Sequence, residues 1–416
     1  MSSLSYLLLF VSVVLVVATF PLLLELFVLS VAALLPQGRL KNGETKADEI
    51  PIAVVIPAHN EEALIGRCVE SLLAGANPAM EILVVAHNCT DATEHEAEAA
   101  GAKVLVLNDP DRRGKGHALS SGFKASLKGK SQAVLVIDAD TVVDAGLIAL
   151  VQKRLQAGAQ ALQCRYEVRN YQDSQRTKLM ALAFCGVNVI RPRGRARLGL
   201  SAGILGNGFA VHREVLTQIP YDAQSVVEDL EYHLALIRAG IRVEFIDSAA
   251  VRAEMPKTAK GARTQRARWE GGRLRMMKRW APDLLVAVFR GRVMQIEPLL
   301  DLLSLPIASA VVLLFVAACM PVPWLRIYAR VAFGVLLLHI AAAAFKGVGF
   351  WTALKALSIA PFYVLWKLWM VPEIWRTSRL DAAWVRTQRE SLADVDSADW
   401  NSIPAVCDDL HERSLL

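Results

Sequence analysis

The sequence is poor in charged residues and has no closely spaced cysteines. Only 21% of its 416 residues are Asp, Glu, Lys or Arg, and its mean hydropathy is +0.35. This composition excludes an intrinsically disordered chain and a small disulfide-stabilised scaffold. None of the six cysteines forms a C-x-x-C pair, so neither a zinc cluster nor a thioredoxin-like motif is predicted. Scattered single cysteines are typical of a reducing compartment.

Charge is absent from long stretches near both ends of the chain. Residues 5–24 contain no Asp, Glu, Lys or Arg, and Glu25 is the first charged residue. About 20 apolar residues cross a bilayer core, and no basic region precedes this stretch as in a signal peptide. We therefore expect an N-terminal membrane helix within 1–38. Three basic residues follow it: Arg39, Lys41 and Lys46. The positive-inside rule then predicts that the next domain is cytoplasmic.

Three further apolar segments lie in the C-terminal half, at about 302–325, 327–345 and 347–371. The last contains Lys355 and Lys367, a pattern that suits either a spanning helix or one in the membrane interface with snorkelling lysines. If all four apolar segments crossed, the arginine-rich tail would end outside, against the positive-inside rule. Three crossings and one in-plane segment are therefore predicted.

The segment between these membrane regions, residues 50–250, has the pattern of an α/β domain. Short β-branched runs alternate with helical periodicity, as in a doubly wound, mainly parallel sheet. Ligands bind outside the carboxyl ends of the strands in such sheets. The expected strands are Ile52–Ile56, Glu81–Val85, Lys103–Leu107 and Ala133–Ile137. The expected helices are Glu61–Leu73, Ala92–Ala100 and Gly116–Leu127.

Positive charge is concentrated in residues 252–292. This stretch has twelve Lys or Arg and three acids, a local charge of +9 against +6 for the whole chain. Beside a membrane segment, such a stretch indicates contact with anionic headgroups or phosphates. No basic motif with interleaved aromatics accompanies it, so nucleic acid is not expected as a partner.

Two acidic motifs could carry chemistry. Asp138 and Asp140 directly follow the strand Ala133–Ile137, and alternation along an extended chain would put both carboxylates on one side. They could then hold a divalent cation and, through it, a diphosphate, or form only a solvated acidic turn. Glu228 and Asp229 open a predicted helix, where acids stabilise the helix dipole; one of them could instead act as a general base on an acceptor hydroxyl.

Two arginine-containing motifs are also candidates. A helix would place Gln265 and Arg268 on one face with Trp269 alongside. The arginine could neutralise a leaving diphosphate, or the helix could lie on anionic lipid. Four arginines also alternate along residues 191–197. They indicate either an exposed strand or loop, or a phosphate clamp for a polyprenyl-diphosphate-linked acceptor that uses Arg191 and Arg193.

These motifs, in this order, resemble glycosyltransferase family 2, the inverting GT-A enzymes. The family includes cellulose, chitin and hyaluronan synthases and bacterial exopolysaccharide transferases. The resemblance covers about residues 50–280. It rests on six segments: VVIPAHNEE, GKGHAL, VIDADT, LGNGFAV, VVEDLE and QRARW. It implies a Rossmann-like GT-A domain between N-terminal and C-terminal transmembrane helices.

The resemblance also implies roles for individual residues. Asp229 would be the catalytic base, next to Glu228, and Asp140 would hold Mg²⁺ or Mn²⁺ on the diphosphate. Asn207 would lie near the acceptor. The nucleotide-sugar would be bound by Pro57, Ala58, Glu61, Asp91, Lys115, Asp138, Gln265, Arg268 and Trp269. One departure concerns His87, which occupies the place after the second strand where the family usually has an acid that reads the base.

The predicted function is transfer of a sugar from a UDP-sugar to a lipid-linked or glycan acceptor at a membrane, in cell-surface polysaccharide synthesis. The resemblance to bacterial transferases implies a multi-pass protein of the inner membrane with its catalytic domain in the cytoplasm. A processive β-polysaccharide synthase, a ceramide or diacylglycerol glucosyltransferase and a non-catalytic membrane scaffold remain alternatives. The expected regions are 1–38 (membrane helix), 50–250 (catalytic domain), 251–298 (basic interfacial helices), 299–371 (membrane segments) and 372–416 (cytoplasmic tail).

Overall fold

The computed structural model describes residues 3–36, 50–222, 225, 227–255 and 259–378, without the side chains of residues 259–262. The chain divides into two compact units, which we describe separately. The helical unit comprises residues 1–35, 172–200 and 263–382, and the sheet unit comprises residues 36–171, 201–262 and 383–416. The basic residues expected to follow the first helix, and most of the predicted tail, lie outside the described residues.

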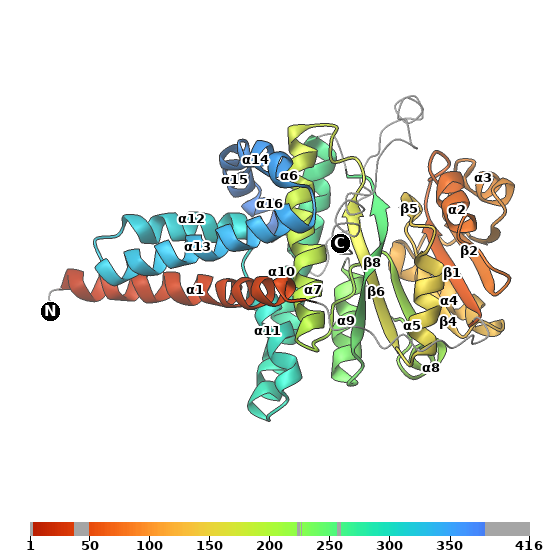
Figure 1. Cartoon of the computed structure of the whole chain (residues 1–416), viewed down its shortest axis with the longest axis horizontal. Coiled ribbons are helices and arrows are strands. Elements are labelled where there is room, and N and C mark those ends of the chain that lie inside the picture. The colour runs from red at the N-terminus through yellow and green to blue at the C-terminus, as the bar shows by residue number, and fades with distance from the viewer. Residues whose placement is uncertain (1–2, 37–49, 223–224, 226, 256–258, 379–416) are drawn as a thin grey trace, which may run out of the picture. The chain divides into compact units, whose positions relative to one another are not determined.

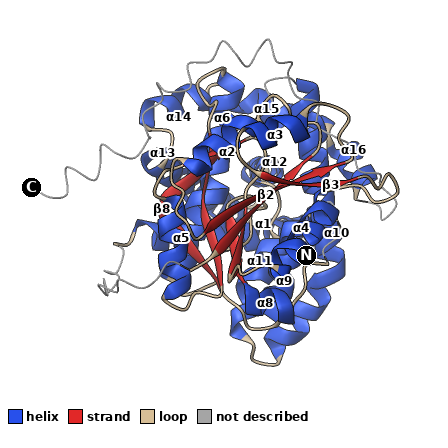
Figure 2. Cartoon of the chain, turned by 90° about the vertical axis from the view of Figure 1, so that its right-hand side faces the viewer, coloured by secondary structure: helices blue, strands red, loops and turns tan. Residues whose placement is uncertain are grey.

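The sheet unit contains one eight-stranded sheet in the order β3-β2-β1-β4-β7-β6-β8-β5. The first four of these strands are parallel, and so are β6 and β8, whereas β7 and β5 run antiparallel to their neighbours. Figure 2 shows the strands in red, turned relative to one another as in any twisted sheet. The strands are β1 Ile52–Ala58, β2 Met80–His87, β3 Lys103–Leu107, β4 Ala133–Val136, β5 Thr141–Val143, β6 Ala161–Val168, β7 Phe209–His212 and β8 Val243–Ala253. The predicted mainly parallel α/β fold is confirmed.

The strand order places a switch point between β1 and β4. From β1 the chain moves outward to β2 and β3, and then returns to the other side of β1 to form β4. The connections on the two sides of such a point diverge and leave a crevice at the carboxyl ends of the two strands. The residues that follow β1 and β4 are therefore placed for ligand binding.

Helices of the sheet unit flank the strands. They are α2 Ile65–Leu73, α3 Thr93–Ala99, α4 Lys115–Lys128, α5 Leu147–Gln156, α8 Arg213–Gln218 and α9 Glu228–Arg238. Helix α4 packs very closely on the sheet, because a Cβ atom at Gly122 would lie 2.6 Å from Val55 of β1. Helix α2 begins four residues later than predicted. The amides of Leu64 and Ile65 both donate to the carbonyl of Glu61, so a turn precedes the helix.

The helical unit is formed by three separate segments of the chain (Figure 1). The first is α1, Ser3–Leu34, and the second holds α6 Gln175–Cys185, a π-helical turn Gly186–Ile190 and α7 Arg191–Arg197. The third contains the remaining helices: most of α10 Ala259–Phe289, then α11 Ile296–Leu303, α12 Ile307–Cys319, α13 Pro323–Lys346, α14 Phe350–Leu357, α15 Ala360–Trp369 and α16 Val371–Thr377.

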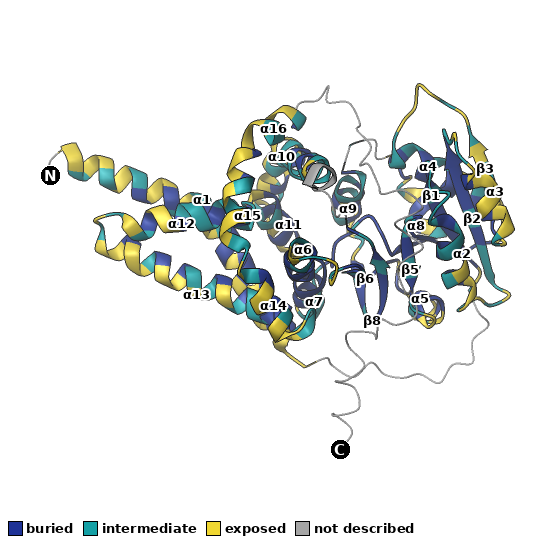
Figure 3. Ribbon diagram, turned by 90° about the horizontal axis from the view of Figure 1, so that it is seen from above, coloured by how far each residue is buried: buried dark blue, intermediate teal, exposed yellow. Residues whose placement is uncertain are grey.

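Two of these helices, α1 and α13, are long and apolar enough to cross a membrane, and α11 with α12 could form a third, bent span. Figure 3 shows many exposed residues along α1 and α13, and the exposed side chains on α1 include Leu7, Phe10 and Val17. The predicted segment 302–325 is not one helix. The chain bends by 77° between α11 and α12, where Pro306 cannot continue α11.

The predicted segment 347–371 is also divided. Helices α14 and α15 have 8 and 10 residues, too few for either to cross a bilayer alone. Lys367 of α15 is buried and forms an ion pair with Glu270 of α10. The three-crossing topology stays a prediction.

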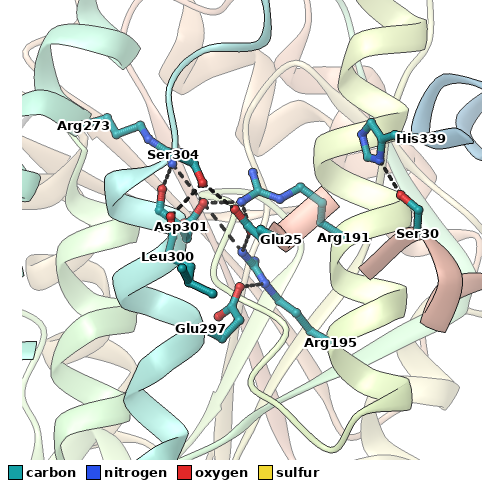
Figure 4. Close-up of polar contacts among 10 residues, drawn as sticks. All are labelled: Glu25, Ser30, Arg191, Arg195, Arg273, Glu297, Leu300, Asp301, Ser304 and His339. Atoms are coloured by element: carbon teal, nitrogen blue, oxygen red, sulfur yellow. Dashed lines mark hydrogen bonds and ion pairs between the residues drawn. The ribbon is translucent and has the colours of Figure 1, made fainter. Parts of the chain in front are cut away.

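A cluster of buried charges joins the three segments of the helical unit (Figure 4). Glu25 of α1 is 2% exposed and forms ion pairs with Arg191 and Arg195 of α7. On the other side, Asp301 of α11 pairs with Arg191 and, at 3.0 Å, with Arg273 of α10. Glu297 pairs with Arg195, and Ser304 donates to Glu25 at 2.9 Å. Three acids thus neutralise three arginines, and four of these six side chains are buried: Glu25, Arg191, Arg195 and Glu297.

We predict that Glu25→Ala strongly destabilises the helical unit. The substitution leaves buried arginine charge without its partner, which typically costs about 3–5 kcal/mol. Glu373→Ala is the control, because it removes an ion pair to Arg263, whose side chain is 57% exposed, and should cost at most about 1 kcal/mol. Thermal unfolding in detergent measures both. Equal losses of stability in the two variants would show that the buried cluster contributes no more to stability than an exposed ion pair.

Candidate functional site

The residues that follow β4 meet a lysine at the switch-point edge of the sheet unit. Lys115, the first residue of α4, forms an ion pair with Asp138. Its Nζ atom also donates to the carbonyl of Gly206 at 2.5 Å. Burial alone would lower the pKa of Lys115, but Asp138, Glu228 and Asp229 together outweigh it and raise this pKa. The predicted acidic motifs therefore gather around one ammonium group.

Asn207 lies beneath this cluster rather than in it. Its side chain is fully buried, accepts from the amide of Asp138 at 3.1 Å and donates to Thr141 Oγ1 at 2.8 Å. Gln163 holds the same loop by donating to the carbonyl of Asn207 at 2.7 Å. Both ends of the Asn207 amide are thus engaged within the protein, and its predicted place near the acceptor stays a prediction. Asn207 positions the turn that carries Asp138 and Asp140.

Asp138 and Asp140 are not on an extended segment. The amide of Thr141 donates to the carbonyl of Asp138 at 3.1 Å, which closes a turn over the two intervening residues. The argument from strand alternation therefore fails. Both carboxylates nevertheless lie near the same thiol: after burial, the charges of Asp140 and Asp138 help to raise the pKa of the buried Cys68.

The turn suits a divalent cation only if substrate completes the site. No group of three or more His, Cys, Asp or Glu able to hold a metal occurs among the described residues. Mg²⁺ commonly takes one or two protein carboxylates and fills its other positions with phosphate oxygens and water. The half-buried carboxylate of Asp140 and its neighbour Asp138 fit that arrangement, with hard oxygen ligands and no soft ones.

Asp229 lies in the first turn of α9, against the loop that holds Gly206. Gly206 has φ +80°, and a Cβ atom there would be only 3.0 Å from Asp229 Oδ2. Burial raises the pKa of Asp229, while the amide of Leu230 and the charge of Lys115 partly offset this effect. A carboxylate with a raised pKa is a better proton acceptor than an exposed aspartate.

The loops after β1 and β2 are held to each other by hydrogen bonds. Asp91 accepts from the amides of Glu62 at 3.2 Å and Thr93 at 3.1 Å, and from the Thr93 hydroxyl. These hydrogen bonds outweigh burial and lower the pKa of Asp91. The amide of Glu61 donates to the Thr93 hydroxyl at 2.7 Å. Asp91 thus orders the loops, and its predicted contact with nucleotide stays untested.

Histidines lie at the end of β1 and β2. His59 donates from Nδ1 to the carbonyl of His87 at 2.8 Å, next to Pro57 and the buried Ala58 at the end of β1. His87 is buried, and burial, with smaller effects from His117 and His59, lowers its pKa. The side chain that replaces the family's usual acid is therefore neutral at physiological pH.

Gln265, Arg268 and Trp269 all lie on α10, within the helical unit. Arg266 stacks on the ring of Trp269, with 5.6 Å between the guanidinium carbon and the ring centroid. Gln265 Oε1 and Arg268 Nε are buried and have no hydrogen-bond partner among the described residues. Their predicted contact with the donor diphosphate stays a prediction.

The structure corrects the prediction that Arg191 helps to clamp the phosphates of an acceptor. Residues 191–197 form the helix α7, not a strand or loop, so alternate arginines do not share a face. Arg191 is 6% exposed and is engaged by Glu25 and Asp301. Its guanidinium is not presented to an acceptor. Arg193, on the same helix, is half-buried, and its role stays a prediction.

The family model described as "Glycosyltransferase like family 2" matches residues 50–272 of this chain, more than half of its length. The chain belongs to this family. The match begins just before β1, includes every strand of the sheet and ends within α10, just beyond the QRARW motif. It includes every candidate site residue named above.

Named relatives agree with this assignment. The probable glycosyltransferase YdaM of Bacillus subtilis is 27% identical over 236 residues, or 54% of this chain and 56% of YdaM. The glucosyl-3-phosphoglycerate synthase of Mycolicibacterium paratuberculosis is 35% identical over 97 residues, or 22% of this chain and 29% of that protein. This family 2 chain thus matches little more than half the length of YdaM and less of the synthase.

A solved structure shares the fold over most of the chain. The mannosyltransferase PcManGT of Pyrobaculum calidifontis, in complex with GDP-mannose and Mn²⁺, has a TM-score of 0.52 and 18% sequence identity. The similarity covers 86% of this chain and 99% of PcManGT. At this identity the similarity shows the fold alone.

Gly206 and Gln163 are the site residues that sequence reasoning missed. Gly206 and Gly208 flank Asn207 with φ values of +80° and +70°. The Gly-Asn-Gly sequence is itself a turn signal, so the loop could have been predicted from it. Gln163 gave no such signal, because it lies on β6, far in sequence from the Asn207 carbonyl that it contacts.

We predict that Gly206→Ala lowers catalytic turnover by at least about tenfold, because the new methyl group displaces the carboxylate of Asp229 and small misplacements are costly in catalysis. Gly240→Ala is the matched control. Gly240 has the same φ of +80°, but nothing lies within 4 Å of its Cβ position. Both variants should lose roughly 1–2 kcal/mol of stability to backbone strain. Equal turnover in the two variants would refute the close approach at Asp229.

Proposed function

We propose that the chain transfers a sugar from a UDP-sugar to a lipid-linked or other membrane-associated acceptor, with inversion at the anomeric carbon. The observation that carries the proposal is the group of Asp138, Lys115 and Asp229 at the carboxyl edge of the sheet. In this group Lys115 supplies a positive charge, Asp138 belongs to a turn whose carboxylates suit a divalent metal, and Asp229 is the candidate base. Membership of the glycosyltransferase-like family supports the reaction class.

The donor side rests on Asp138 and Asp140. In this proposal Asp140 holds Mg²⁺ or Mn²⁺ on the diphosphate, and Asp138, anchored by Lys115, contacts the nucleoside. The cation would stabilise the negative charge that develops on the leaving diphosphate. Lys115 adds a second positive charge at the same edge. The Mn²⁺ in the PcManGT complex is consistent with this requirement.

The acceptor side rests on Asp229. Its carboxylate takes the proton from the acceptor hydroxyl as the oxygen attacks the anomeric carbon. The bond between that carbon and the diphosphate oxygen breaks, and its electron pair leaves with the diphosphate. A single displacement of this kind inverts the anomer, so an α-linked donor gives a β-linked product. Burial around Asp229 strengthens its interaction with the developing charge.

The membrane context rests on the helical unit. Two helices able to span a bilayer would hold the enzyme at the surface where lipid-linked acceptors lie. Arg39, Lys41 and Lys46 after the first helix support a cytoplasmic active site through the positive-inside rule, and the resemblance to bacterial transferases is the basis for proposing the inner membrane and polysaccharide synthesis. The buried arginines of α7 no longer support a polyprenyl-diphosphate acceptor, so the acceptor class rests on the membrane helices alone.

A processive synthase is the second candidate. The QRARW motif resembles one that is common among polysaccharide synthases and favours this alternative. Two or three candidate spans provide little wall for a polymer channel in one chain. Product length separates the two functions: a ladder of oligomers supports processivity, and a single added sugar excludes it.

The deciding experiment is release of nucleoside diphosphate by membranes that contain the full chain. A panel of UDP-sugars is offered with Mg²⁺, Mn²⁺ or a chelator, and GDP-mannose is included because PcManGT binds it. Release that depends on UDP-sugar, metal and acceptor lipid supports the proposal. Release with GDP-mannose alone would reassign the donor, and no release with any donor would favour a non-catalytic scaffold.

We predict that Asp229→Asn abolishes transfer while UDP affinity changes less than about threefold. The amide keeps the shape of the side chain but cannot accept the acceptor proton, a contribution typically worth 10²–10⁴-fold. Calorimetry with UDP and the transfer assay measure the two effects. Glu231→Gln, on the same helix, is the control. Retained turnover in Asp229→Asn would remove Asp229 from the role of base.

The raised pKa of Asp229 also predicts two pH effects. The acidic limb of kcat/KM should lie above the ordinary aspartate value of about 4, because the base must be ionised. The folded state binds this proton more tightly than the unfolded state, so ionised Asp229 destabilises the fold at neutral pH. Asp229→Asn should therefore raise Tm at pH 7, with the gain vanishing near pH 4. If the Tm gain of Asp229→Asn instead increased as the pH fell, the pKa of Asp229 could not be raised in the folded state.

A further inference from the structure

The turn between α10 and α11 exposes apolar side chains to an unusual degree. We define the α10–α11 turn as residues 285–296, the end of α10, the short 3₁₀ helix Val293–Gln295 and the start of α11. Phe289 is 83% exposed and Val293 is 66% exposed. The other exposed apolar residues of the turn are Leu285, Val286, Met294 and Ile296. Soluble surfaces rarely expose apolar residues at this density.

The turn is an ordered structure. The amide of Gly291 donates to Val288 and that of Arg292 donates to Ala287, with Gly291 at φ +82°. This pair of hydrogen bonds is the Schellman motif, which ends a helix in a defined geometry. On the other side of the turn, Gln295 is buried, and its backbone amide donates to the carbonyl of Arg292 at 3.0 Å. The exposed apolar residues are therefore presented at fixed positions.

Within the helical unit, the turn is placed at one end of a candidate bilayer span. Helix α11 meets α1 at Glu25 through the buried charge cluster, 22 residues after α1 begins at Ser3. At 1.5 Å per residue this separation is about 33 Å, close to the thickness of a bilayer core. The segment formed by the 3₁₀ helix and α11 is bent by 77° from α12. If α1 and α12 cross, α11 lies nearly parallel to the membrane surface.

The charge of the turn matches an anionic surface. Arg290 and Arg292 are exposed, and neither has an ion-pair partner among the described residues. Several other basic residues of the stretch 252–292 are already used inside the protein: Arg252 by Asp144 and Glu167, Arg263 by Glu373, and Arg273 by Asp301. Arg290 and Arg292 are the basic residues of the stretch that lie within the α10–α11 turn, so they are the ones placed to contact headgroups there.

We propose that the α10–α11 turn inserts into the surface of an anionic bilayer. Phe289, Val293 and Met294 lie among the upper acyl chains, and Arg290 and Arg292 bind headgroup phosphates. The turn is an in-plane anchor at the leaflet where α1 ends, beside the spans and separate from them. Apolar side chains flanked by arginine are the composition of interfacial anchors, and each basic residue adds to binding on anionic lipid. The proposal stands independently of the catalytic one.

The test measures immersion of a spin label in the full chain reconstituted in vesicles. Cys89, Cys319 and Cys407 are replaced by serine, and a nitroxide is attached to Phe289→Cys. Val106→Cys, at an exposed apolar residue of β3 in the sheet unit, is the matched control. With roughly one-third phosphatidylglycerol in phosphatidylcholine, the label at 289 should be accessible to oxygen and protected from a nickel chelate. The label at 106 should show the reverse.

Charge reversal tests the arginines. Arg290→Glu with Arg292→Glu should shift the ratio of immersed to exposed label by roughly thirtyfold towards exposed, whereas Lys128→Glu with Lys130→Glu should leave it unchanged. Equal nickel accessibility at 289 and 106 would overturn the proposal. Dipolar broadening between labels at 289 would also overturn it, because the turn would then be covered by a second copy of the chain. If the label at 289 is immersed equally in vesicles with and without phosphatidylglycerol, the proposed role of the arginines is refuted.

Discussion

The ion pair between Lys115 and Asp138 is the interaction on which the catalytic proposal depends. Without the ammonium group, Asp138, Glu228 and Asp229 would repel one another at the edge of the sheet, and the raised pKa of Asp229 would rise further. Lys115 also holds the carbonyl of Gly206, so the same side chain fixes the loop that lies against Asp229. The donor side and the acceptor side of the site are thus organised by one residue at the start of α4.

Support for this site comes from buried amides rather than from further charges. Asn207 and Gln163 join the turn after β4 to the loop before β7 through hydrogen bonds that water cannot reach. The turn that carries Asp138 and Asp140 is thereby held at a fixed position against the loop that contains Asn207. Such support is a common requirement for precise catalytic geometry.

The parallel half of the sheet was predictable because its strands are continuous β-branched runs, and Lys103–Leu107 was predicted to the residue. Motif order predicted one site that contains Asp138, Asp229 and Lys115, but not that the acids gather around the lysine. What could not be predicted depends on contacts between distant segments. Asn207 is buried by β6 and the turn after β4, and Arg191 by α1 and α11. The bend at Pro306 divides a run that composition alone describes as one span.

The charge cluster of the helical unit constrains how this chain can change. Its acids come from residues 25, 297 and 301 and its arginines from residues 191, 195 and 273, so the two signs are encoded far apart. Helices α6 and α7 belong to the helical unit but lie in the sequence between β6 and β7 of the sheet unit. A chimaera that exchanges only the catalytic region, residues 50–272, between two family members would import Arg191 and Arg195 without the acids that neutralise them. A chimaera that folds must therefore exchange α1 together with the catalytic region. Homologues should gain or lose Glu25 and Arg191 together.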